Sequence, residues 1–248
     1  MRKTDKISAI IEARMTSSRL PGKVLLPADG KPMLEHLVDR LKQVQSIRDI
    51  VLATTINGAD SCLEEFARKN GIECFRGSEQ DVMDRVIGAA DSVDADIIVD
   101  ITGDCPIIDP LIIEQTIQVF LHNTCDYASN CHIRSYPDGM DTQVFRIDTL
   151  KHSATLTMNP LDHEHVTLHI RNHPEIFKHI NLFAPPDLYW PELGLTLDEK
   201  KDYELLKNLI EYFGSANPYF SCREVIILLK TKPEWIAINR EVQRKGIS

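Results

Sequence analysis

Three cationic side chains follow the first apolar run of this 248-residue chain. The run Ile7 to Ile11 predicts a β-strand. The loop after it carries Arg14, Arg19 and Lys23, with serines between them and a Pro-Gly turn before the lysine. Guanidinium, ammonium and hydroxyl groups make charge-assisted hydrogen bonds to phosphate oxygens, and ligands of open α/β sheets bind beyond the carboxyl ends of strands. The stretch therefore predicts a site for a polyanion such as a triphosphate.

A solvated basic turn is the alternative interpretation of these three cations. The chain as a whole is acidic, with 37 Asp and Glu against 28 Lys and Arg and a formal net charge of −9. A cationic cluster that opposes the charge of the whole protein favours a binding role. The loop is not a Walker A P-loop, because it lacks the Gly-x-x-x-x-Gly-Lys-Ser/Thr pattern.

Two aspartates far apart in the sequence are candidates for a metal site. Asp104 follows the apolar run 97–101 and Gly103, so we expect it at the same sheet edge as the cationic loop. Asp198 stands between an apolar segment and a helical one, a strand-to-helix position that also predicts a sheet edge. A turn role for Asp104 and a helix-cap role for Asp198 or Thr196 are the alternatives. Mg²⁺ takes one or two carboxylates plus phosphate oxygens, so two such aspartates would suit a metal-bound triphosphate.

Short apolar runs alternate with helical periods in the first half of the chain, which predicts βαβ units and a parallel sheet. Strands are expected at 7–11, 50–54, 73–75 and 97–101, and helices at 33–45, 62–70, 81–92 and 109–122. The pattern is irregular from 125 to 146, with short strands at 127–129 and 143–145. Beyond it we expect a helical stretch at 147–173 broken near Asn159-Pro160, a strand at 178–184, and helices at 199–213 and 221–230.

These elements predict an α/β protein with a Rossmann-like three-layer fold and a mostly parallel sheet. No linker, repeat or low-complexity tract divides the chain, so we expect one domain over residues 1–248. The irregular segment around 125–195 is interpreted as an insertion that serves dimerisation or acceptor binding, and we expect a homodimer.

Composition and targeting signals limit the possible partners and location. No apolar run approaches the about 20 residues of a membrane span, and the N-terminus lacks the pattern of a signal peptide. The six cysteines form no Cys-x-x-Cys pair, as is usual for buried thiols in a reducing compartment. A sequence pI of about 5.5 argues against nucleic-acid binding. We therefore expect a cytoplasmic protein with neither a membrane nor a nucleic-acid partner.

Three histidines four residues apart, His165, His169 and His173, would share one face of a continuous helix. Two of them could then chelate a transition metal such as zinc. A solvated or partner-facing side of a helix is the more frequent role of such a stripe.

Six short motifs run in order over about residues 7–206: the cationic loop, Gly77–Arg85, Gly103–Pro106, Pro137–Asp141, Glu164–Thr167 and Leu197–Glu204. Together they resemble the cytidylyltransferases that activate acidic sugars, the Kdo and acylneuraminate enzymes. The resemblance is closer still to the spore-coat-polysaccharide branch of that superfamily. One departure is Glu12, where the Kdo and neuraminate enzymes carry proline. A carboxylate beside a triphosphate is unfavourable unless it points away.

The resemblance implies a nucleotidyltransferase that uses CTP and Mg²⁺. A hydroxyl of a small acidic sugar or sugar-like acid would attack the α-phosphorus, giving a CMP-sugar and pyrophosphate for polysaccharide or glycan synthesis. It implies nucleotide contacts from Ala13, Arg14, Ser18, Arg19, Lys23, Asp81 and Arg85. It implies a metal site at Asp104 and Asp198, catalysis by these two with Arg14 and Lys23, and acceptor contacts from Asp138, Asp141, Glu164 and His165. Turn formation around Gly139 is the alternative role of Asp138 and Asp141.

Two other classes of function stay open at this point. A nucleotide-sugar-dependent glycosyltransferase would also hold a metal, but its usual Asp-x-Asp occurs only as Asp94-Ala95-Asp96, before a strand rather than after one. A non-catalytic nucleotide-binding partner of another enzyme would be expected to lose a phosphate cation or a metal aspartate. The candidates for both roles are all present in this chain.

Overall fold

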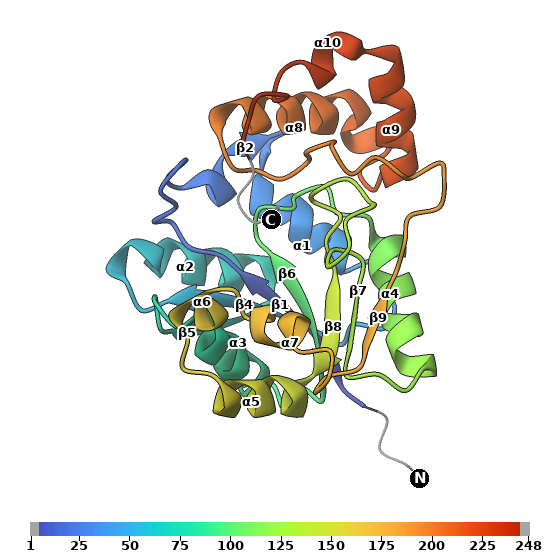
Figure 1. Cartoon of the computed structure of the whole chain (residues 1–248). Coiled ribbons are helices and arrows are strands. Elements are labelled where there is room, and N and C mark those ends of the chain that lie inside the picture. The colour runs from blue at the N-terminus through green and yellow to red at the C-terminus, as the bar shows by residue number, and fades with distance from the viewer. Residues whose placement is uncertain (1–4, 244–248) are drawn as a thin grey trace.

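A twisted seven-stranded sheet forms the centre of the computed structural model, which describes residues 5–243 (Figure 1). Its strand order is β5-β4-β1-β6-β8-β7-β9. The strands are β1 (Ile7–Glu12), β4 (Asp49–Thr55), β5 (Glu73–Gly77), β6 (Ile97–Thr102), β7 (Tyr127–Ser129), β8 (Gln143–Arg146) and β9 (His179–Asn181). Within the described residues, β8 alone runs antiparallel to its neighbours in this sheet. The expected mostly parallel α/β architecture is therefore confirmed.

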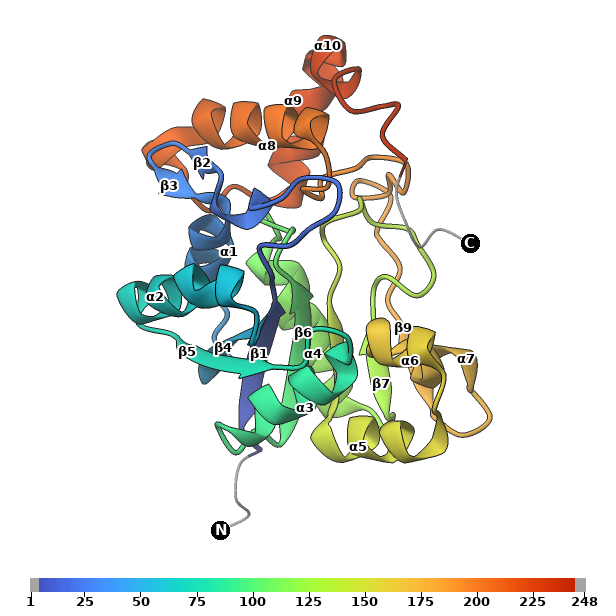
Figure 2. The same cartoon turned by 90° about the vertical axis from the view of Figure 1, so that its left-hand side faces the viewer.

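Helices cover both faces of the sheet, which gives three layers (Figure 2). On one face pack α1 (Met33–Leu41), α2 (Ser61–Asn70) and α4 (Pro110–His122). On the other pack α3 (Val82–Asp91), α5 (Ile147–Leu156) and α7 (Leu168–Asn172). Strand β1 shows why: Ile11 faces the first group and Ile10 the second, and both are fully buried. A strand covered on both faces reads as a continuous apolar run, which is the signal in the sequence.

A third group of helices lies beyond the carboxyl edge of the sheet, in red and orange in Figure 1. It contains α8 (Lys200–Phe213), α9 (Cys222–Thr231) and α10 (Pro233–Ile236), beside a small hairpin of β2 (Pro27–Ala28) and β3 (Lys31–Pro32). The buried Arg40 of α1 joins this group to the sheet, because its guanidinium donates to the carbonyls of Ile108, Pro218 and Phe220. Burial lowers the pKa of Arg40 to about 10.

Several helix ends lie where the sequence predicts them. Asp81 and Asp109 cap α3 and α4 through side-chain oxygens that accept backbone N–H groups. Gly71 ends α2 in the left-handed conformation, with φ of 63°. Short 3₁₀ helices lie at Lys23–Leu25, Gly58–Asp60 and Gly214–Ala216.

The expected helix over 147–173 is broken twice rather than once. The break near Asn159 is confirmed, since α5 ends at Leu156 and α6 (Pro160–Glu164) begins after it. A second break separates α6 from α7, where Val166 has a positive φ of 44°. The expectation that His165, His169 and His173 share one helix face is therefore wrong. Likewise, the strand expected at 178–184 is reduced to the three residues of β9.

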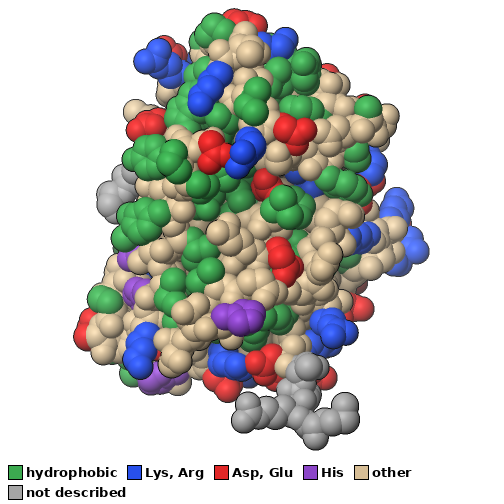
Figure 3. All heavy atoms as spheres, turned by 90° about the vertical axis from the view of Figure 1, so that its right-hand side faces the viewer, with side chains coloured by type: hydrophobic (Ala, Val, Ile, Leu, Met, Phe, Trp, Pro, Cys, Tyr) green, Lys and Arg blue, Asp and Glu red, His purple; other side chains and the backbone are tan. Residues whose placement is uncertain are grey.

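Exposed hydrophobic side chains lie in separate groups among charged ones on the face shown in Figure 3. Within residues 5–243, no helix has both the length and the apolar character needed to cross a bilayer. The single domain and the homodimer stay predictions.

Candidate active site

The buried carboxylate of Asp60 anchors the loop after β1. Asp60 accepts hydrogen bonds from the backbone N–H of Met15, at 2.7 Å, and from the Thr55 hydroxyl at the end of β4. Gly103, after β6, comes so close that an added Cβ would lie 2.9 Å from both the Ala13 Cβ and the Glu12 carbonyl oxygen. The ends of β1, β4 and β6 therefore fix the path of the chain that carries the cations.

Lys23 connects the two candidate metal aspartates. Its ammonium lies 2.9 Å from Asp104 Oδ2 and 3.0 Å from Asp198 Oδ1. Arg19 reaches the same Asp198 oxygen at 2.7 Å and also donates to the backbone carbonyl of Gln243. Arg14, in contrast, is exposed and makes no hydrogen bond or ion pair with any residue in the described part of the chain. The structure thus brings together all five charged residues on which the expected chemistry depends.

The charges of this cluster stabilise one another. Burial disfavours the charged form of Lys23, but the two carboxylates outweigh it and raise the pKa of its ammonium. Burial likewise disfavours ionisation of Asp104, but Lys23 and the Thr102 hydroxyl outweigh it and lower the pKa of that carboxyl. Both groups are therefore charged at neutral pH.

Asp198 reaches the cluster by a different path from the expected one. Residues 195–197 form no strand of either sheet, so the expectation of a strand end is wrong. Instead the Leu197 N–H donates to the Asp104 carbonyl oxygen at 2.8 Å, which places Asp198 beside Asp104. Nor does Thr196 or Asp198 cap α8, because Glu199 is its N-cap and forms a capping box with Asp202. The side chain of Asp198 is thus available to Lys23 and Arg19.

A cleft of about 310 Å³ contains this cluster. It is lined by Glu12, Ala13, Arg14, Ser17, Ser18, Arg19, Lys23, Val24, Val82, Arg85, Thr102, Asp104, Glu164, His165 and Asp198. The cleft lies at the carboxyl ends of β1 and β6, as expected for a ligand site in such a sheet. Nearly every nucleotide or metal residue predicted from the sequence is among these fifteen.

Glu12 lines the cleft but is paired with another acid. Its carboxyl shares a side-chain hydrogen bond with Asp100, two residues before the end of β6, so one proton must lie between them. Burial and then the Asp100 charge raise the pKa of Glu12 well above its usual range, and burial raises the pKa of Asp100 to about 6. A protonated Glu12 carries no negative charge toward an anionic ligand. This resolves the difficulty raised by its position in the cationic loop.

Arg85 and Asp81, predicted together, differ in their surroundings. Arg85 lines the cleft, donates to the Ser78 carbonyl at 2.6 Å, and keeps a buried Nε that has no partner within the described residues. Asp81 is not among the described residues that line the cleft. It caps α3 and pairs with His163 at 2.8 Å, and this hydrogen bond raises the pKa of His163.

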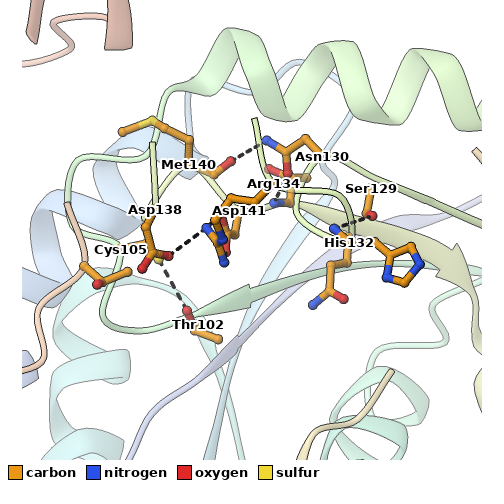
Figure 4. Close-up of polar contacts among 12 residues, drawn as sticks. Thr102, Cys105, Ser129, Asn130, His132, Arg134, Asp138, Met140 and Asp141 are labelled. Atoms are coloured by element: carbon orange, nitrogen blue, oxygen red, sulfur yellow. Dashed lines mark hydrogen bonds and ion pairs between the residues drawn. The ribbon is translucent and has the colours of Figure 1, made fainter. Parts of the chain in front are cut away.

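Asp138 and Asp141 flank Arg134, which the sequence reasoning did not single out. Figure 4 shows the Arg134 guanidinium between the two carboxylates, at 2.9 Å from Asp138 and 3.1 Å from Asp141. Arg134 and Asp138 are four residues apart in the sequence, and this spacing of opposite charges was the signal that could have predicted the pair. Burial, and the charges of Asp138 and Asp104, raise the pKa of Asp141 to about 6 despite the arginine.

The turn expected around Gly139 is present and packs closely against residues 193–195. Gly139 has φ of 103°, and an added Cβ would lie 2.6 Å from the Leu195 carbonyl oxygen. Backbone hydrogen bonds join Asp138 to Leu193 and Leu195 on either side of it. The turn therefore holds the segment that leads to Asp198.

The histidines of 163–173 have separate roles in the structure. His165, at the end of α6, lines the cleft together with Glu164. His169 is buried and its Nδ1 lies 3.0 Å from the Ser153 hydroxyl, whereas His173 pairs with Glu175. Among the residues that the structure describes, no cluster of three or more His, Cys, Asp or Glu is arranged to hold a metal.

The Asp94-Ala95-Asp96 sequence lies at the end of β6 opposite the cleft. It precedes β6, whose other end carries Asp104. Asp94 lies in a turn with φ of 51°, and Asp96 accepts the Lys6 backbone N–H at 2.7 Å. Both aspartates thus serve the amino edge of the sheet, which removes the main feature that favoured a glycosyltransferase.

A mostly parallel sheet with cations and carboxylates gathered at its carboxyl edge is the arrangement expected of a nucleotidyltransferase. The sequence matches the family model described as Cytidylyltransferase over residues 8–224. It is 37% identical over 230 residues to the spore coat polysaccharide biosynthesis protein SpsF of Bacillus subtilis, covering 91% of this chain and 94% of that one. The chain therefore belongs to the cytidylyltransferase family, as its motifs predicted.

Solved structures agree with this assignment. A cytidylyltransferase from Leptospira borgpetersenii superposes with a TM-score of 0.90 at 34% identity, covering 97% of this chain and 99% of the other. A CMP:2-keto-3-deoxy-manno-octonic acid synthetase in complex with CTP superposes with a TM-score of 0.63 at 20% identity, covering 84% of this chain and 99% of the other. The second likeness is one of fold.

Proposed function

We propose that this chain transfers CMP from CTP to a hydroxyl of a sugar acid or sugar-like acid, releasing pyrophosphate, in the assembly of a surface polysaccharide or glycan. The observation that carries the proposal is the convergence of Arg14, Arg19 and Lys23 with Asp104 and Asp198 in one cleft. The name of the SpsF relative and the CTP complex of the octonic acid synthetase support the pathway and the nucleotide.

The triphosphate would bind to the cationic loop. Arg14 lines the cleft with a guanidinium that no residue of the described chain engages, and Ser17 and Ser18 add hydroxyl donors to the lining. Arg19 and Lys23 now pair with Asp198, and a phosphate oxygen that approached them would receive charge-assisted hydrogen bonds of the same kind.

The pair of aspartates fits Mg²⁺. Two carboxylates already converge on one cationic group, since a single ammonium lies within 3.0 Å of both. Magnesium prefers oxygen ligands and typically binds one or two carboxylates together with phosphate oxygens and water. Asp104 and Asp198 would hold the ion, and when bound it would supply positive charge that neutralises the triphosphate and polarises the α-phosphorus.

The residues of the cleft would act chiefly by position and charge. The acceptor hydroxyl would give its proton to solvent water, its oxygen would form a bond to the α-phosphorus, and the bond from this phosphorus to the pyrophosphate oxygen would break. Negative charge grows on the phosphates as this happens, so Lys23, Arg14 and Arg19 would bind the transition state more tightly than the ground state. Protonation of Glu12 keeps a further negative charge away from the reacting centre.

Arg85 is the candidate for recognition of the cytosine base. Its buried Nε lacks a partner within the described residues and belongs to a residue of the cleft wall. Cytosine presents acceptors at O2 and N3 that such a donor can satisfy. Asp81 would act indirectly, because it caps the helix α3 that carries Arg85.

The proposal is tested by incubation of the protein with each of the four nucleoside triphosphates, Mg²⁺ and a panel of sugar acids, with pyrophosphate as the readout. We expect release with CTP and little with the other three. Absence of release with CTP for every acceptor, together with absence of CTP binding in calorimetry, would contradict the proposal. Arg68→Met, on the exposed side of α2, is a control variant that should match the wild type.

A further inference from the structure

A row of polar side chains crosses the sheet next to the cleft. Asp100 of β6 pairs in register with Gln143 of β8, Gln143 with Ser129 of β7, and Ser129 with Asn181 of β9. Residues in register point to the same face, here the face covered by α3, α5 and α7. Apolar residues fill the rest of this face, so a polar row across four strands is a departure that requires a partner.

The row is only partly satisfied by the protein itself. Gln143 donates to Asp100 at 3.1 Å and accepts from the hydroxyls of Thr167 and Tyr127. The Asn181 side-chain oxygen, however, is buried and has no hydrogen-bond partner within residues 5–243. Gln143 and Asn181 are both partly exposed, so a ligand can reach this end of the row.

Arg171 lies beside the row and forms no ion pair with a residue in the described part of the chain. Its backbone N–H bonds to the Thr167 carbonyl, one turn earlier on the same side of α7, and the Thr167 hydroxyl touches Gln143 at 2.6 Å. Because Arg171 follows Thr167 by four residues, it lies on the side of this turn that meets Gln143. In the described part of the chain its buried Nε has no hydrogen-bond partner, and it forms no ion pair.

The row is continuous with the cleft. Glu12 and Thr102, which line the cleft, are in register with each other on the same face, and Asp100 is the next residue inward on that face of β6. Glu164 and His165 also line the cleft and come directly before the turn that carries Thr167. Figure 4 shows Ser129 and His132 on one side of Arg134 and Thr102 on the other.

We propose that Arg171 and the polar row of Asp100, Gln143, Ser129 and Asn181 form the acceptor subsite, in which Arg171 binds the carboxylate of a polyhydroxylated acid. This inference rests on the proposed CMP transfer and names the residue that selects its acceptor. An unpaired guanidinium binds a carboxylate through two parallel hydrogen bonds. Amide and hydroxyl groups in a row offer the donors and acceptors that sugar hydroxyls require. The neighbouring Asp100 carboxyl, with a pKa of about 6, disfavours a doubly charged phosphate at this position more than a singly charged carboxylate.

The test compares wild type with Arg171→Met, Arg171→Lys and the control Arg68→Met. Pyrophosphate release is measured with CTP and Mg²⁺ on two sugar acids, Kdo and N-acetylneuraminate, on the neutral polyol sorbitol, and on a hexose phosphate. We expect at least one acid, and neither other compound, to be used. Arg171→Met should raise the KM for the acid about 10- to 100-fold, the loss of a charged hydrogen bond, with the KM for CTP unchanged. The KM of Arg171→Lys for the acid should lie between that of the wild type and that of Arg171→Met.

Thermal unfolding gives a second readout that does not depend on activity. Arg171 has no counter-ion among the described residues, so Arg171→Met should melt no lower than the wild type. A clear loss of melting temperature would show a structural role instead, and would overturn the inference.

The kinetic outcomes separate this inference from the proposed function. Use of sorbitol or the hexose phosphate as readily as an acid, or an unchanged KM in Arg171→Met, would overturn the acceptor assignment. CTP binding without use of either acid would also overturn it, while leaving the nucleotide site in place. Failure to bind CTP at all would overturn the proposed function itself.

Discussion

Replacement of Asp104 by asparagine separates the chemistry of the cleft from its fold. Asparagine keeps the size of the side chain, and the Asp104 backbone carbonyl still accepts the Leu197 N–H at 2.8 Å. Lys23 loses one carboxylate but keeps Asp198 at 3.0 Å. The two side chains of the lost ion pair are 11% and 23% exposed, so its stabilisation lies between that of an exposed and a buried pair. We expect a loss of about 1–2 kcal/mol in the free energy of unfolding at neutral pH.

The pH dependence of this loss has a definite sign. The folded-state pKa of Asp104 is lowered, so the carboxylate contributes stability above the ordinary aspartate pKa of 3.8 and loses it as the pH falls through the folded-state pKa. The difference in unfolding free energy between wild type and Asp104→Asn should therefore be constant near neutral pH and shrink in acid. Urea denaturation at several pH values measures it.

Turnover should fall far more than stability does. Asp104 would act on the developing phosphate charge through the Mg²⁺ that it holds, and loss of such charge stabilisation typically lowers kcat about 100- to 1,000-fold. The control is Asp91→Asn, which also removes a carboxylate from a lysine, here the exposed partner Lys151 at 2.7 Å. It should leave turnover unchanged. An Asp104→Asn variant that is folded and retains turnover within about fivefold of wild type would refute the role of this carboxylate.

Three further variants test other parts of the account. Glu12→Gln replaces a carboxyl whose pKa is raised by burial and by the Asp100 charge. Above the ordinary glutamate pKa of 4.5, the folded protein keeps a proton on this carboxyl that the unfolded chain releases. The stability of the wild type therefore falls as the pH rises above 4.5 toward the folded-state pKa. The melting temperature of the variant, relative to wild type, should therefore increase from about pH 5 to about pH 8, and a constant difference would contradict the shared proton. Gly139→Ala places a methyl group 2.6 Å from the Leu195 carbonyl oxygen at a positive φ. Urea denaturation should therefore show a loss of more than about 2 kcal/mol in the free energy of unfolding. An unchanged free energy of unfolding would show that the turn can adjust. Arg85→Gln should weaken CTP binding about tenfold in calorimetry while the melting temperature changes little, and unaltered affinity would remove Arg85 from the nucleotide site.

The parts of the fold that were predictable from the sequence are those with local signals. Apolar runs with few polar interruptions located β1, β4 and β6, because strands covered on both faces must be apolar on both. Capping residues located the starts of α3 and α4. The second break, between α6 and α7, could not be predicted, because it depends on a positive φ at Val166, a residue type that rarely adopts one.

The candidate site was predictable in its residue types and not in its pairings. The cationic loop and Asp104 follow β1 and β6, which are neighbouring parallel strands, so their meeting at one edge follows from the topology. Asp198 meets them through a backbone hydrogen bond between residues 104 and 197, which no local pattern encodes. The Glu12–Asp100 pair and the polar row beside Arg171 depend on register between strands that are distant in sequence.

The most direct test of the central claim is detection of the product by mass spectrometry after incubation with CTP, Mg²⁺ and sugar acids. The proposed transfer predicts a compound with the mass of the acid plus CMP minus water, formed in equal amount to pyrophosphate and absent when Lys23 is replaced by methionine. Consumption of CTP without such a compound, or its undiminished formation by Lys23→Met, would contradict the proposed transfer.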